Sequence, residues 1–203
     1  MNNSELCEIA KKHENRGEIE KAYQCYLEAA LAEDDGEAMY ALAQMYFEGD
    51  YVHESHEKAG RYFGLAYDRG IKVDAWTLIL AGDYFGREEE TEEEINLAKK
   101  YYQAAGESGE PFGYECLGYL YMKQGKYDLA YECFMKAGPK NTLGFYCLGK
   151  MYDEGLGVEK NTGTAVDYYG EVIRIGIKYE EEYGEDDFCV KAKKRLTELN
   201  VGW

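Results

Sequence analysis

Apolar and small residues recur along this chain in a pattern that is repeated five times. In each copy a small residue follows a large apolar one, an aromatic or similar residue comes three positions later, and a second alanine is followed by an aromatic four positions on. The five small anchors are Ala10, Ala43, Ala81, Gly118 and Gly149, spaced 33, 38, 37 and 31 residues apart. A period in this range predicts stacked helix–turn–helix units, which bury their apolar faces only against their neighbours.

Each copy is expected to contain two antiparallel helices. The first helices are predicted at residues 4–14, 36–47, 74–85, 111–122 and 143–153. The second helices are predicted at residues 19–32, 56–69, 92–108, 127–137 and 162–179. The small anchor lets the second helix approach the first closely, and the nearby aromatic packs in the seam between them. Glycines fall in the predicted turns, where a positive φ is tolerated.

The repeats are expected to form one elongated domain over residues 1–203. Their predicted bounds are 4–35, 36–72, 73–110, 111–141 and 142–176, followed by a capping segment at 177–203. Within that segment, residues 185–199 carry one apolar stripe at helical spacing, which predicts a helix that covers the exposed face of the fifth repeat.

The charge balance narrows the choice of partners. The chain of 203 residues has 23 basic and 40 acidic residues, a net charge of −17. Such a charge repels nucleic acid and anionic lipid surfaces and favours a basic protein partner. The alternative is that the acidic surface only maintains solubility. Two acidic runs, at 88–94 and 179–187, are expected to be solvated loops or helix starts.

Targeting and cysteine patterns favour a cytoplasmic location. The first residues have no basic start followed by an apolar core, and no apolar run reaches the length of a membrane helix. The six cysteines include no Cys-x-x-Cys pair, so a zinc or redox site is not expected. We expect them to be small buried side chains rather than disulfides.

The fourth and fifth copies carry a family resemblance, and the second copy has the spacing of the fifth. The fourth resembles a tetratricopeptide repeat, although Thr142 stands where that repeat usually has proline; the matching residues are Tyr114, Leu117, Gly118, Tyr121, Ala130, Phe134 and Ala137. The fifth resembles a Sel1-like repeat through Leu148, Gly149, Tyr152, Gly155, Gly157, Val158, Asn161, Ala165, Tyr168 and Tyr169. The resemblance covers about residues 4–176 and implies an all-α solenoid, a right-handed superhelix of about five helix pairs plus a C-terminal capping helix. It also implies a scaffold that works in protein complexes.

In this family the first helices line a concave groove, which gives a candidate binding site. Residues at three register positions of these helices are expected to face it: three before the small anchor, one after it, and four after it. The predicted apolar centre is Phe47, Leu78, Phe85 and Met122. The predicted rim is Tyr40, Gln44, Glu115, Tyr119, Tyr146 and Lys150. Apolar residues aligned across repeats indicate a protein or peptide site. The alternative is that superhelical curvature buries this row between neighbouring first helices.

Catalytic chemistry is not indicated. The chain has no phosphate-binding loop, dinucleotide fingerprint or serine elbow. His53 and His56 lie with two glutamates in one turn, which is weak evidence for a metal site. We therefore expect no enzymatic activity, no cofactor and no metal.

Two functions remain open. The first is a non-catalytic scaffold or adaptor that binds a peptide or protein in its groove. The second is an acidic immunity or inhibitor protein that neutralises a basic toxin or nuclease; its binding would weaken in high salt. The oligomeric state is not indicated.

Overall fold

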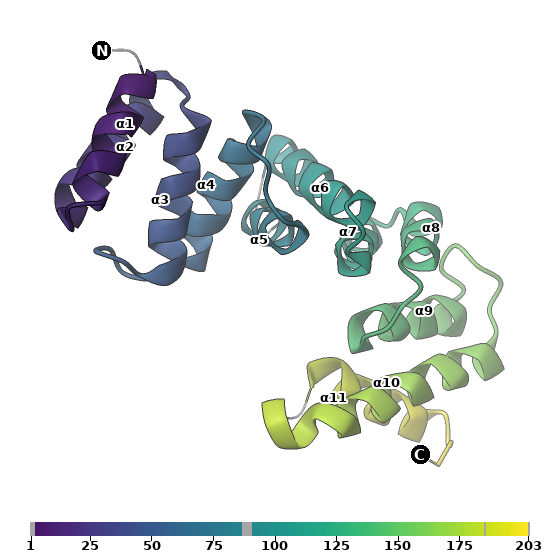
Figure 1. Ribbon diagram of the computed structural model, residues 1–203. Helices are drawn as coiled ribbons and strands as arrows, with labels where there is room; N and C mark the ends of the chain where they lie inside the picture. The colour runs from purple at the N-terminus through teal and green to yellow at the C-terminus, as the bar shows by residue number, and fades with distance from the viewer. Residues whose placement is uncertain (1–2, 87–90, 185, 203) are drawn as a thin grey trace. The chain divides into compact units, whose positions relative to one another are not determined.

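The computed structural model describes residues 3–86, 91–184 and 186–202, and all the regular structure in these ranges is α-helical (Figure 1). Eleven helices occur there, and consecutive helices pack as sequential pairs. The predicted all-α architecture of helix pairs is therefore confirmed. Within these ranges, no helix combines the length and apolarity needed to cross a membrane.

The chain forms two compact units, Met1–Glu110 and Pro111–Trp203. The first unit contains α1 (Asn3–Glu14), α2 (Ile19–Glu33), α3 (Gly36–Glu48), α4 (His56–Asp68), α5 (Ala75–Phe85) and α6 (Glu92–Glu107). The second contains α7 (Pro111–Lys123), α8 (Tyr127–Ala137), α9 (Thr142–Glu154), α10 (Thr162–Tyr183) and α11 (Asp187–Glu198). The division falls at the predicted boundary between the third and fourth repeats, so neither unit divides a predicted repeat.

The helix bounds agree with the predicted ones within two residues, with one exception. The backbone of α10 continues to Tyr183, four residues past the predicted end, so the start of the 179–187 acidic run is helical rather than a loop. Of the other acidic run, residues 88–90 lie outside the described ranges, while Glu92 starts α6.

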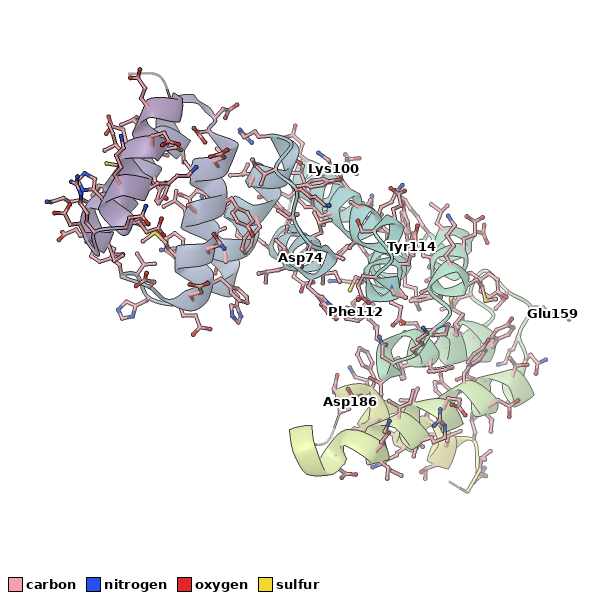
Figure 2. All side chains as sticks on the ribbon, in the orientation of Figure 1. Asp74, Lys100, Phe112, Tyr114, Glu159 and Asp186 are labelled. Atoms are coloured by element: carbon pink, nitrogen blue, oxygen red, sulfur yellow. The ribbon has the colours of Figure 1, made fainter. Side chains whose placement is uncertain are left out.

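Short polar side chains set where the helices begin. Asp35, Ser55, Asn141 and Asn161 each accept a hydrogen bond from the backbone N–H three residues further on. Thr91 does the same, and its own backbone N–H donates to the Glu94 carboxylate, which completes a capping box. Such caps satisfy backbone donors that the helix itself leaves free. The Asp186 carboxylate likewise caps α11, and this residue is labelled in Figure 2.

The seams within the repeats are built on the small anchors. Ala10, Ala43 and Ala81 are completely buried. At Gly149, a Cβ atom would lie only 2.8 Å from two ring carbons of Tyr169 on the paired helix α10. The anchors therefore give room to the aromatic residue of the second helix, as the sequence predicts.

Candidate functional site

Six of the ten predicted groove residues line two hollows, one in each unit. Tyr40 and Gln44 line a hollow in the first unit. Tyr119, Met122, Tyr146 and Lys150 line a hollow in the second unit. Most of these residues occupy the register positions one after or three before a small anchor, so these two positions face open surface in the second, fourth or fifth repeat, although not in every copy.

The hollow of the first unit, which we call the acidic hollow, has a volume of about 500 Å³. It lies mainly between α1 and α3, with contributions from α2 and the loops that follow α3 and α4; its lining residues are Lys11, Glu14, Tyr26, Glu37, Tyr40, Ala41, Gln44, Met45, Glu48, Asp50 and Ile71. Four carboxylates thus face one lysine. The Lys11 ammonium lies 2.7 Å from Glu37, and the Tyr26 hydroxyl donates to Glu14 over 2.9 Å.

The hollow of the second unit, which we call the lysine hollow, has a volume of about 340 Å³. It is formed by α7, the first residue of α8, α9, the turn after α9 and α11; its lining residues are Tyr119, Met122, Lys123, Tyr127, Tyr146, Cys147, Lys150, Glu154, Leu156, Phe188 and Lys191. Its aromatic side chains lie close to lysines: the Lys191 ammonium is 5.3 Å from the centre of the Phe188 ring. The hollow therefore presents both cationic and aromatic groups.

The Cys147 thiol and the Lys191 ammonium of the lysine hollow both have raised pKa values. Burial raises the pKa of the Cys147 thiol to about 12, which keeps it protonated and unreactive at neutral pH. The hydrogen bond from Lys191 to Asp187 raises the pKa of Lys191, so its ammonium stays charged.

Three residues of the predicted groove are buried instead. Leu78 and Glu115 are each 1% exposed and Phe85 is 8% exposed. The Phe85 ring packs against the rings of Tyr84 and Tyr101, at 4.7 and 5.6 Å between centroids. None of the three offers surface to a ligand.

The register position four after the anchor explains part of this result. It shares a helical stripe with the anchor and so points at the paired helix. Asp153, at that position in the fifth repeat, is 2% exposed and accepts a hydrogen bond from Tyr169 of α10. Phe47, at the same position in the second repeat, is 47% exposed but contacts the rings of His56 and Phe63. The expectation that this row lies in an open groove is wrong for Phe85 and Asp153.

Seven of the eleven lining residues of the lysine hollow were not predicted as site residues, and Phe188 and Lys191 are two of them. Phe188 and Lys191 belong to α11, outside the five repeats, so the repeat register assigns them no position. The available signal was local: Phe188 is part of the predicted apolar stripe of the capping segment, and Lys191 begins its basic cluster.

The histidines form no metal centre in the part of the chain that the structure describes. No group of three or more His, Cys, Asp or Glu side chains could hold an ion there. His56 instead lies 3.1 Å from Glu54 and stacks on Phe47. His13 lies 2.5 Å from Glu18 in the turn of the first repeat.

Solved structures show the same fold. The chain resembles, over 97% of its length, a protective antigen of uropathogenic Escherichia coli with an SLR (Sel1-repeat) fold, at 20% identity and a TM-score of 0.52. It spans 46% of that protein, about half of its length. It also resembles a Sel1 repeat protein of Oxalobacter formigenes at 18% identity, with 98% of this chain and 86% of that one covered and a TM-score of 0.52.

A third similar structure is that of the TPR-like MamA protein, at 18% identity and a TM-score of 0.54, covering 90% of this chain and 96% of that one. No protein-family model matches the chain. At these identities the likeness shows the fold alone. The predicted resemblance to Sel1-like and tetratricopeptide-like repeats is thus confirmed at the level of fold.

Proposed function

We propose that the chain is a non-catalytic scaffold that binds a protein or peptide partner through its two hollows. The observation that carries this proposal is that residues at the same register positions of different repeats line open hollows, namely Tyr40 and Gln44 in one and Tyr119 and Lys150 in the other. In helical repeat proteins the stacked units present extended surfaces for binding.

The composition of the hollows supports recognition of a polypeptide. Each combines aromatic side chains with charged groups at its edge. Tyrosine offers a large apolar surface and a hydroxyl that can bond to a peptide backbone. Exposed aromatic residues surrounded by polar ones are typical of the positions that carry most of the binding energy in protein interfaces.

Photo-crosslinking tests the proposal. A photoreactive phenylalanine analogue would replace Tyr40 in one variant and Tyr119 in another, and each would be irradiated in a lysate of the source organism. Met135, which is 52% exposed on α8 and lines neither hollow, is the matched control position. We expect a specific protein to be linked at Tyr40 or Tyr119 and not at position 135, and the purified partner to bind the unmodified chain. Equal labelling at all three positions would contradict the proposal.

A second candidate function is an inhibitor of a basic protein, such as a toxin. The acidic hollow favours it, because four carboxylates there face one lysine. Binding of a basic partner at this hollow should weaken strongly with salt, whereas binding driven by apolar contacts should not. Titrating the purified partner at low and high ionic strength separates the two functions.

A further inference from the structure

The lysine hollow has a local charge opposite in sign to the net charge of the chain. Lys123, Lys150 and Lys191 line it together with one carboxylate, that of Glu154. Lys191 also pairs with Asp187, and Lys150 lies 4.0 Å from Glu154, so with Asp187 counted the local surplus is one positive charge, in a chain whose net charge is −17. At physiological ionic strength charges are screened over about 8 Å. A ligand inside the hollow therefore senses these lysines more than the carboxylates elsewhere on the chain.

Aromatic rings lie among these lysines. The rings of Tyr146 and Phe188 pack at 5.3 Å between centroids with an interplanar angle of 42°. Tyr119 is 42% exposed, and Lys191 and Lys123 are also exposed, so the hollow opens to solvent. A ligand can thus bury an apolar side chain against the rings while its charged groups stay at the solvent-exposed rim of the hollow.

The C-terminal helix supplies one side of the hollow. Its buried stripe of Cys189, Ala192 and Leu196 packs in the core of the second unit. Phe188 and Lys191 lie outside that stripe and line the hollow. Helix α11 is therefore more than a cover for the apolar face of the fifth repeat.

Two polar contacts fix α11 against α9 and so set the position of Phe188 and Lys191. At its start, the Thr142 hydroxyl donates to Asp186 over 3.1 Å. Near its end, Arg195 forms two hydrogen bonds with Asp153. The hollow is thus preorganised, which lowers the entropy cost of binding a ligand.

We propose that the lysine hollow binds an acidic peptide segment of a partner protein, with an apolar side chain of that segment on the aromatic rings and α11 as a recognition element. This rests on the proposed scaffold function and names the partner class for one of its two hollows. The lysines pair with carboxylates, and a basic segment is repelled. Nucleic acid would need many phosphate contacts on a chain that is acidic overall.

A selection from a randomised peptide display library tests this proposal. The whole chain would be used as the target, in parallel with the double variant Lys150→Glu/Lys191→Glu. Lys194→Glu is the matched control, because Lys194 is exposed on the same helix but does not line the hollow. Circular dichroism would show that all three proteins are folded.

We expect the wild type and Lys194→Glu to select peptides with a negative net charge and an aromatic or aliphatic residue. Affinity of the selected peptides, measured by fluorescence anisotropy, should fall at least about tenfold in the double variant and stay nearly constant in Lys194→Glu. Tyr119→Ser should weaken the same peptides without changing their preference for negative charge.

Two results would overturn the inference. If the selected peptides are neutral or basic, or bind the double variant equally well, the chain binds peptides but the lysine hollow is not an acidic-peptide site. If no peptide is enriched, the inference also fails, and the crosslinking experiment decides independently whether the scaffold function stands.

Discussion

The guanidinium group of Arg195 forms two hydrogen bonds with the carboxylate of Asp153: Nε lies 2.6 Å from Oδ2, and Nη2 lies 3.0 Å from Oδ1. The carboxylate is nearly inaccessible to solvent and also accepts a bond from the Tyr169 hydroxyl over 3.5 Å. One buried charge on α9 thus connects to both α10 and α11. The pair therefore couples the C-terminal helix to the fifth repeat.

Replacing Arg195 by methionine should destabilise the second unit by about 2 kcal/mol, because the Asp153 carboxylate would stay buried without its cation. Removing one partner of a fully buried ion pair destabilises a protein more. The expected loss is smaller here because the Arg195 side chain is 37% exposed. Urea unfolding followed by circular dichroism measures the change.

Arg174→Met, which breaks an exposed pair with Glu171, is the control and should change stability little. Asp153→Asn/Arg195→Met should be more stable than Arg195→Met alone. The role assigned to the pair is wrong if Arg195→Met behaves like Arg174→Met.

The same pair should make stability depend on pH. Hydrogen bonding to Arg195 lowers the pKa of Asp153 in the folded protein. A group with a lowered folded pKa stabilises the fold above its unfolded pKa, about 3.9 for aspartate, and this contribution is lost as the pH falls through the folded value. Asp153→Asn should therefore be less stable than wild type at pH 7, and the difference should shrink below about pH 4.

Thermal unfolding of both proteins across this pH range measures that difference directly. Glu171→Gln is the control, since its ion pair with Arg174 is exposed; its difference from wild type should stay small throughout. A gap between wild type and Asp153→Asn that is constant down to the lowest pH would contradict the expectation.

Most of the fold could be predicted because the repeated pattern indicates both the helices and the turns between them. The small anchors and aromatics predict the helix pairs, and the glycines predict the turns between them. The end of α10 could not be predicted, since its last turn runs through the acidic segment, whose glutamates suit a helix as well as a solvated loop.

The candidate site was only partly predictable, although the sequence held a further signal. In the first repeat, the Tyr26 hydroxyl of the second helix donates to Glu14 of the first helix. In the fifth repeat, the Tyr169 hydroxyl donates to Asp153 in the same way. Where the second helix carries phenylalanine, as at Phe63, the same position is apolar. This correlation holds in four repeats and fails in the third, where Tyr102 donates to Asp83 and the position holds Phe85. It indicates that the position four after the anchor faces the paired helix, although Met122 at this position also lines the lysine hollow. The contribution of α11 depends on tertiary packing, which no repeat register contains.

Adding a methyl group at an anchor should disturb the seam that it forms. In Gly149→Ala, the new Cβ would lie 2.8 Å from carbons of the Tyr169 ring, which is buried and packed against Tyr146. We expect a loss of about 1–3 kcal/mol from overpacking. Gly170→Ala on α10 is the matched control, since nothing lies within 4 Å of its Cβ, and it should stabilise by up to about 1 kcal/mol through helix propensity. Urea unfolding of the two variants should give changes of opposite sign; equal signs would refute the close approach at Gly149.

The six cysteines, all in described parts of the chain, should differ sharply in reactivity. All are free thiols, and five are buried while Cys25 is partly exposed. Burial raises the pKa of Cys7 to about 12 and that of Cys133 to about 11, so these thiols are both shielded and protonated at neutral pH. In native protein an aromatic disulfide reagent should therefore modify one thiol, slowly, because burial also raises the pKa of Cys25. Cys25→Ser should abolish this reaction, whereas all the cysteines should react in denaturant. Modification of two or more thiols at similar rates in the native Cys25→Ser variant would show that the helix seams open far more readily than this packing implies.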